Sequence, residues 1–229
     1  MPNWTYNEIK INSDKNTIAS IKDFVKSNDR EFDFNKIVPM PASLNVESGS
    51  RTDTAIMVFL SDKLTTKPDK KKDKWKLAYE VLHNFFSKDW VKELYDRLSK
   101  EPPKDIDKLY EEGKQYVNNY KAYGAVTWYE WCNANWGTKW NACEVTMDEP
   151  SNEEVTYFFD TAWCCPYPVI AELSRLYPNV KIEHTFRNED GYENIYTDTY
   201  LNGALINEQT EIDEEYLKEL EEEEREYGD

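Results

Sequence analysis

Histidine and cysteine, which often serve as catalytic base and nucleophile, are few in this chain of 229 residues, which holds two histidines and four cysteines. Carboxylates are plentiful, but without a defined pair their abundance is weak evidence for acid–base or two-metal chemistry. A hydrolytic site needs a nucleophile beside a positioned base, and neither His83 nor His184 is flanked by a signature of that kind. His184 lies in a strand-like segment, where we expect it on the less buried face. No P-loop, GxGxxG or HExxH pattern occurs. We therefore expect no catalytic residue, and an enzyme of unrecognised type is the open alternative.

The cysteines lack the spacing of a metal site. Zinc ligation uses four soft ligands, commonly in CxxC pairs, and no such pair occurs among Cys132, Cys143, Cys164 and Cys165. We expect free thiols in a reducing cytoplasm, with no metal and no cofactor. A disulfide between the neighbours Cys164 and Cys165 is a rare alternative that stays open.

The densest aromatic stretch runs from 123 to 142 and holds Trp128, Trp131, Trp136 and Trp140, half of the eight tryptophans. A tryptophan buries a large apolar area but must place its indole N–H, so such a cluster is typical of a structural hub. The alternatives are a binding platform for a partner, with Trp128 and Trp131 on one face of a helical turn, and a pocket for a small ligand or an enzyme's substrate, to which Trp163 would add.

Charge is the most informative bulk property. The formal net charge is −17 and the isoelectric point is about 4.6, which disfavours direct contact with nucleic acid or with an anionic membrane and favours a basic protein partner. The segment 208–229 is nearly all acidic. The candidate partner-binding carboxylates are Asp213, Glu214, Glu215, Glu219, Glu221, Glu222, Glu223 and Glu224. A plain solubilising tail is the alternative.

The elements that would position these residues follow from hydrophobic periodicity. They are a strand at 7–12, a helix at 16–27 with Asp14 as its N-cap, an extended segment or a start of helix at 54–60, three helices within 69–122, strands at 139–148 and 154–163, a helix after Pro166, a strand at 180–187, and one or two strands within 192–205. This order predicts an α+β protein with a ferredoxin-like split βαβ antiparallel sheet and a helical insertion. The predicted domains are 1–68 with 123–207, the insertion 69–122, and an acidic C-terminal helix or tail at 208–229.

Four blocks in the chain carry a resemblance to a known family. They are NWTYNEIKI at residue 3, FDFNKIVPMP at residue 32, the tryptophan-rich stretch at residue 123 and TAWCCPYPVI at residue 161. In this order they resemble the YubB-type ferredoxin-like family of uncharacterised bacteriophage and plasmid proteins. The chain departs from the family at Thr5, at the Cys164–Cys165 pair and in its enlarged insert. The resemblance implies a fold and a genomic setting, and no reaction.

From these observations we expect a non-enzymatic phage or mobile-element accessory protein. It would bind and inhibit a host defence protein with a basic nucleic-acid-binding groove, such as a CRISPR effector or a restriction enzyme, through an acidic surface that mimics nucleic acid. The second alternative is an acidic regulatory partner within a phage-encoded complex. No apolar run approaches the roughly 20 residues of a membrane span and no secretory signal is recognised at the start, so we expect the host cytoplasm.

Overall fold

The computed structural model describes residues 2–69, 72–83 and 90–219. The chain divides into two compact units, one made of Met1–Pro39 with Cys132–Asp229 and the other of Met40–Trp131. We call them the sheet unit and the helical unit and describe each by itself. The helical unit is larger than the predicted insertion at 69–122. It also includes residues 40–68 and 123–131, which the sequence analysis assigned to the sheet domain.

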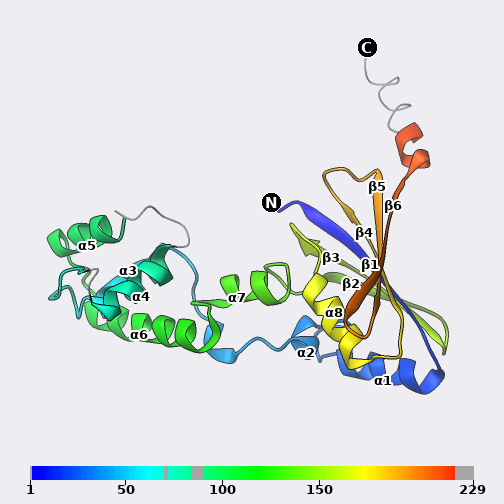
Figure 1. Cartoon of the computed structure of the whole chain (residues 1–229), viewed down its shortest axis with the longest axis horizontal. Coiled ribbons are helices and arrows are strands. Elements are labelled where there is room, and N and C mark those ends of the chain that lie inside the picture. Colours follow the sequence, from blue (N-terminus) through cyan, green and yellow to red (C-terminus); the bar gives the residue numbers. More distant parts are fainter. Residues whose placement is uncertain (1, 70–71, 84–89, 220–229) are drawn as a thin grey trace, which may run out of the picture. The chain divides into compact units, whose positions relative to one another are not determined.

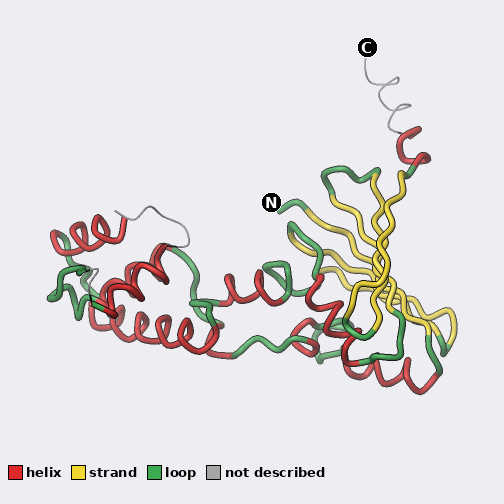
Figure 2. Tube along the Cα trace, in the orientation of Figure 1, coloured by secondary structure: helices red, strands yellow, loops and turns green. Residues whose placement is uncertain are grey.

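The sheet unit is built on a six-stranded antiparallel sheet, ordered β2-β3-β1-β4-β5-β6 (Figures 1 and 2). Strand β1 lies between β3 and β4 and is paired with both along most of its length. With one helix after β1 and another after β3, the first four strands have the β-α-β-β-α-β order that defines a ferredoxin-like fold, which confirms the predicted fold class. The strands are β1 (Trp4–Asn12), β2 (Cys143–Ser151), β3 (Glu154–Ala162), β4 (Ile182–Asn188), β5 (Asn194–Leu201) and β6 (Ala204–Ile212).

Helices α1 (Lys15–Val25), α2 (Phe34–Ile37) and α8 (Tyr167–Leu176) lie on one side of this sheet (Figure 1). Helix α1 begins where predicted, because the side chain of Asp14 accepts hydrogen bonds from the N–H groups of Asn16 and Thr17. The core between sheet and helices combines aliphatic side chains with several aromatic rings. The ring of Phe32, in the connection after α1, stacks on Phe159 of β3 with centroids 5.3 Å apart.

The last hairpin extends the sheet further than the sequence predicted. Asn202 and Gly203 both have positive φ angles, as the favoured two-residue hairpin turn requires, and β6 follows as far as Ile212. The segment 208–229, predicted to be a tail or a helix, therefore begins inside a strand. Residues 214–219 are helical, and 220–229 lie outside the described residues.

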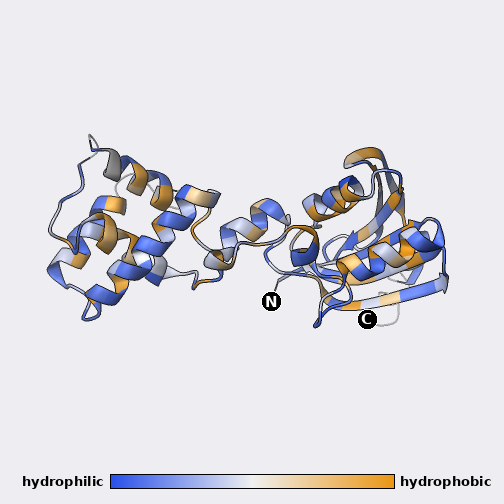
Figure 3. Cartoon of the chain, turned by 90° about the horizontal axis from the view of Figure 1, so that it is seen from below, coloured by the Kyte–Doolittle hydropathy of each residue, from blue (hydrophilic) through white to orange (hydrophobic). Residues whose placement is uncertain are grey.

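The helical unit contains the turn η1 (Ala42–Leu44) and the helices α3 (Ser50–Leu60), α4 (Asp73–His83), α5 (Trp90–Lys100) and α6 (Ile106–Tyr123). The last three are the helices predicted within 69–122, whereas α3 takes the place of an extended or partly helical segment. Both units use helices with mixed apolar and polar sides (Figure 3). Helix α7 (Trp128–Asn135) runs across the limit between the units.

Helices α3 and α6 pack closely because Gly113 of α6 has no side chain. A Cβ atom at Gly113 would lie 2.0 Å from the carbonyl oxygen of Ala55 and 2.8 Å from the Cβ of Phe59. Both neighbours belong to α3, so the backbones of the two helices approach each other at this point.

Candidate binding site on the open face of the sheet

The candidate site lies on the face of the sheet opposite α1, α2 and α8, which we call the open face. Side chains alternate between the two faces of a strand, and in β1 every second residue is buried on the helix side. Tyr6 and Glu8 therefore project from the open face. Asp160 and Phe158 of β3 lie directly opposite Tyr6 and Glu8, respectively, so the four side chains form one block on the two central strands.

This block lines a hollow of about 280 Å³. Tyr6 is 40% exposed and Phe158 is 39% exposed, which is high for large apolar groups at the middle of a sheet. The hollow is completed by Thr185 and Arg187 of β4 and by Tyr192 of the β4–β5 loop. Its lining thus combines aromatic rings, two carboxylates and one guanidinium group.

Arg187 shows how a cation is held at this site. Its guanidinium carbon lies 5.1 Å from the ring centroid of Tyr192, and its Nη1 atom donates to the carboxylate of Asp213 over 2.7 Å. The ring of Tyr192 in turn meets Tyr6 edge to face, with centroids 5.5 Å apart. A guanidinium group between an aromatic face and a carboxylate is a favourable arrangement.

A second cation–aromatic contact lies beyond the end of β1 nearest Tyr6. The Nζ atom of Lys139 is 3.9 Å from the ring centroid of Trp140 and 5.8 Å from that of Trp163. Trp140 also contacts Trp4, with centroids 6.2 Å apart, and Trp4 belongs to the same alternate set of β1 as Tyr6. Trp163 is 54% exposed, so this cluster adds aromatic surface next to the site.

The two carboxylates of the block have no hydrogen-bond or ion-pair partner in the part of the chain that the structure describes. Burial, and then the charge of Glu144, raises the pKa of Asp160 above its ordinary value. Burial, followed by the charges of Glu189 and Asp160, raises the pKa of Tyr6. The smaller, coulombic part of each shift comes from neighbouring carboxylates, whose negative charge favours an incoming cation.

This arrangement can bind an extended basic segment more readily than a nucleic acid. Exposed aromatic rings on the central strands of such a sheet can stack nucleotide bases, but Glu8 and Asp160 would repel the phosphates that accompany them. Lysine and arginine side chains lie favourably over aromatic rings, by about 0.5–2 kcal/mol per contact. The same carboxylates would then accept their hydrogen bonds.

The predicted tryptophan platform is divided between different environments. Trp131 is only 7% exposed, which leaves it little surface to offer a partner, and Trp128 is half-buried. Trp136 is buried against Phe34, and its indole N–H donates to the carbonyl oxygen of Val38 over 2.9 Å. The burial of Trp131 and Trp136 agrees with the hub interpretation, whereas Trp140 contributes exposed surface.

The predicted acidic contacts are partly placed by the structure. Asp213 accepts a hydrogen bond from the N–H of Tyr216 and pairs with Arg187. These two bonds, the first having the larger effect, lower the pKa of its carboxyl group. Glu214, Glu215 and Glu219 are exposed on the following helical segment. The other candidate carboxylates, Glu221, Glu222, Glu223 and Glu224, lie outside the described residues.

His184 was expected on the less buried face, and this expectation was wrong. The residue lies two positions from both Ile182 and Phe186, so the alternation of β4 turns all three toward the helices, and the His184 side chain is fully buried. The hydrogen bonds of its neighbour Asn7 show that the proton of the imidazole ring is on Nε2. The amide NH₂ of Asn7 donates to other oxygens, so the Asn7 Oδ1 atom accepts from Nε2 of His184 over 3.0 Å. Nδ1 is left without a partner among the described residues.

The cysteines are all free. Cys164 is exposed and Cys165 is buried, so the open alternative of a disulfide between these neighbours is not present. Burial raises the pKa of the Cys165 thiol, which keeps it protonated and a poor nucleophile. In the described ranges, no group of three or more His, Cys, Asp or Glu side chains is placed to hold a metal ion.

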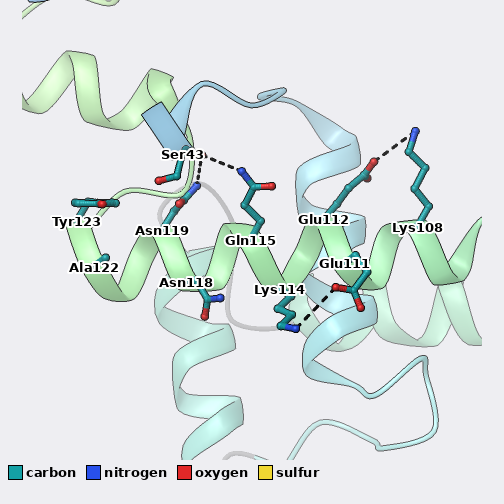
Figure 4. A pocket seen from close by; sticks show the side chains of 10 residues that line it. All are labelled: Ser43, Lys108, Glu111, Glu112, Lys114, Gln115, Asn118, Asn119, Ala122 and Tyr123. Atoms are coloured by element: carbon teal, nitrogen blue, oxygen red, sulfur yellow. Dashed lines mark hydrogen bonds and ion pairs between the residues drawn. The ribbon is translucent and has the colours of Figure 1, made fainter. Parts of the chain in front are cut away.

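The helical unit contains a larger hollow, of about 880 Å³, along one side of α6 (Figure 4). Most of its polar side chains are already paired with neighbouring groups, although Asn118 has no partner among the described residues (Figure 4). Lys114 pairs with Glu111 over 3.9 Å, and the amides of Gln115 and Asn119 both donate to the carbonyl oxygen of Ser43. This hollow offers a ligand fewer unpaired groups than the open face of the sheet.

The residues of the open face did not stand out in the sequence, because the first strand was expected only at 7–12. A strand beginning at Trp4 would have set Tyr6 apart from the buried series, and Phe158 would have stood out in the same way within 154–163. An aromatic residue at a position that alternates with the buried residues of a central strand could have indicated this site from the sequence.

Comparison with known proteins supports the fold. A family model described as the ferredoxin-like domain in Api92-like protein matches residues 135–228. The crystal structure of a protein api92 from Yersinia pseudotuberculosis is similar with a TM-score of 0.44 and 10% sequence identity, over 92% of this chain and 98% of that chain. No curated protein matches the chain. The family description names no reaction.

The resemblance to a YubB-type family was therefore wrong, since the model that matches describes Api92-like proteins. The expected bacteriophage setting, with its counter-defence and anti-CRISPR roles, rested on that resemblance and is withdrawn with it. No helix within the described ranges is long and apolar enough to cross a bilayer. What the comparisons leave is a chain similar to the ferredoxin-like domain of Api92-like proteins.

Proposed function

We propose that the protein is a non-enzymatic binding module that captures a basic segment of a protein partner on the open face of its sheet. The observation that carries the proposal is the block of exposed Tyr6 and Phe158 beside Glu8 and Asp160, whose carboxylates have no partner among the residues that the structure describes. Arg187 offers a precedent within the chain, since its guanidinium group is held between a ring and a carboxylate on the same face.

The charge of the whole chain supports the same class of partner. A net charge of −17 attracts basic proteins, including those whose surfaces hold nucleic acid, and speeds their association. A location in the cytoplasm belongs to the proposal as well, because the four cysteines are free thiols.

A synthetic peptide of alternating glycine and arginine tests the site, because such a peptide is cationic and has little strand propensity. We expect the wild-type protein to bind it, and expect Tyr6→Ala and Phe158→Ala each to weaken binding at least fivefold through the loss of a cation–aromatic contact. Fluorescence anisotropy of the labelled peptide gives the dissociation constants.

Tyr123→Ala is the matched control, because Tyr123 is 46% exposed in the helical unit, far along the chain from the site. It should leave the affinity unchanged. A single-stranded oligouridine is the competing probe. If it bound more tightly than the peptide and lost affinity in Phe158→Ala, the open face would read nucleic acid and the proposal would be wrong.

A further inference from the structure

The outer edge of β6 is a second surface that the open face does not include. The strand has nine residues, all of them exposed, and spans about 30 Å at roughly 3.4 Å per residue. It ends the sheet, and no other strand in the described ranges pairs with its outer side. Leu205, Ile206 and Ile212 are 43%, 53% and 61% exposed. A long exposed edge of this kind presents unpaired backbone groups to any chain that can add a strand.

The opposite edge of the sheet shows the contrast. Strand β2 is interrupted by register shifts between Cys143 and Thr146 and between Asp148 and Ser151. It also contains Pro150, which has no N–H to donate. Bulges and proline are the usual protection of an edge strand. Strand β6 has neither between Asn207 and Ile212, where its register with β5 is continuous.

A pair of neighbouring carboxylates next to the β6 edge indicates that a partner at this edge is positively charged. Asp198 of β5 lies directly opposite Glu208 of β6, and like charges in that position destabilise a sheet. Neither carboxylate has an ion-pair partner within the described part of the chain. Burial, and then the charge of Glu208, raises the pKa of Asp198. A cation placed beside Glu208 would relieve this repulsion.

We infer that β6 docks an extended, basic segment of a protein partner as a seventh antiparallel strand. The segment carries lysine or arginine opposite Glu208 on the helix side of the sheet and opposite Glu211 on the open side. Because these positions are three apart, the partner's two cations are also three residues apart, with β-branched residues between them. The inference goes beyond the proposed function, since β6 and the open face are different surfaces that share only the basic character of the partner.

A second copy of this chain is a poorer occupant of the same edge. A two-fold antiparallel pairing that uses the whole strand has its centre at Glu208, so that Glu208 of each copy would face its counterpart. Like charges directly opposite each other are unfavourable, and each copy brings a net charge of −17. The charge of the edge thus favours a basic partner.

A nine-residue peptide of threonine and valine, with lysine at its second and fifth positions, is the probe. In an antiparallel strand these lysines lie opposite Glu211 and Glu208. We expect wild-type protein to bind it and expect Glu208→Lys to weaken binding at least tenfold. Glu93→Lys, an equal change of charge at an exposed position of α5, should change it less than threefold. A peptide with glutamate in place of lysine should bind Glu208→Lys more tightly than wild type.

Backbone methylation of the peptide tests strand pairing without altering the protein. Alternate N–H groups of an added strand point to its neighbour, so methylation of one alternate set should abolish binding and methylation of the other should not. Equal effects of the two sets, equal losses in Glu208→Lys and Glu93→Lys, or no binding to wild type would each overturn the inference. A wild-type dimer in sedimentation that Thr210→Pro abolishes would overturn it in favour of a second copy.

The same peptide separates this inference from the proposed function. Binding that responds to Glu208→Lys and to methylation, yet not to Phe158→Ala, supports the β6 edge irrespective of the open face. Loss of the glycine–arginine peptide in Phe158→Ala, with no response of the strand-forming peptide to Glu208→Lys, leaves the proposed function standing and overturns the inference.

Discussion

At the scale of single residues, burial has changed the properties of groups whose types alone are unremarkable. His184 is enclosed between sheet and helices, and burial lowers its pKa to about 3. Asp53 of α3 lies at a cavity of about 70 Å³ that also includes Glu130. Burial, and then the charge of Glu130, raises the pKa of Asp53 to about 6. Because each of these pKa values differs between the folded and the unfolded protein, each makes the free energy of unfolding depend on pH.

His184 should cost the protein stability in acid. The unfolded imidazole takes up a proton below its ordinary pKa of about 6.5, whereas the folded one stays neutral until about pH 3. Stability is therefore complete above pH 6.5 and falls as the pH drops through that window, by up to about 1.4 kcal/mol per pH unit. Urea unfolding from pH 7.5 to 4.5 should show a smaller loss in His184→Gln than in wild type. An identical slope in the two proteins would contradict this prediction.

Asp53 should act in the opposite direction. Its folded pKa is about 6 and its unfolded pKa about 3.9, so folding holds a proton in this window and stability falls as the pH rises through it. We expect Asp53→Asn to raise the free energy of unfolding at pH 7.5 by about 1 kcal/mol, after allowance for partial exposure. At pH 3.5 the gain should vanish. Asp96→Asn, at an exposed position of α5, is the control, and an equal gain at both pH values would count against the explanation.

At the scale of elements, close packing decides which helices pair. Helices α3 and α6 meet at Gly113, where the backbones leave no space for a methyl group. The sequence showed Gly113 inside an amphipathic helix, where glycine costs about 1 kcal/mol relative to alanine, but it did not show which neighbour required the gap. That neighbour is α3, which had been considered an extended or partly helical segment.

Gly113→Ala should accordingly be destabilising despite the better helix propensity of alanine. The new Cβ atom would clash with the backbone of Ala55, at a cost of roughly 2–4 kcal/mol. Gly49→Ala is the control, because nothing lies within 4 Å of a Cβ there. Hydrogen exchange should show the loss of protection in α3 and α6 and little change in the strands. A stable Gly113→Ala variant would mean that the two helices do not pack this closely.

At the scale of the whole molecule, charge is the property that the sequence states most directly. With 45 acidic and 28 basic residues, the chain carries a long-range negative field, while the sites proposed for basic partners are local. Long-range fields chiefly govern association rates, and local contacts govern dissociation. Changing the salt concentration should therefore separate the effect of the long-range field from that of the local contacts.

Raising the salt concentration from 20 to 300 mM should slow the association of the lysine-bearing peptide by about tenfold, because the Debye length shortens from tens of ångströms to less than 10 Å. The dissociation rate should change much less. Stopped-flow fluorescence measures both, and a peptide with threonine in place of lysine is the control. An association rate that does not depend on salt would exclude steering by the net charge.

The sequence by itself determined the fold class, the cap of α1 at Asp14 and the three helices of 69–122, because these follow from local periodicity and local hydrogen bonds. The tertiary structure alone decided that Tyr6 and Phe158 meet Glu8 and Asp160 on one face, and that Asp198 lies opposite Glu208 at the edge. These contacts join residues of different strands. The strands' register is set by packing across the sheet, which no local pattern in the chain specifies.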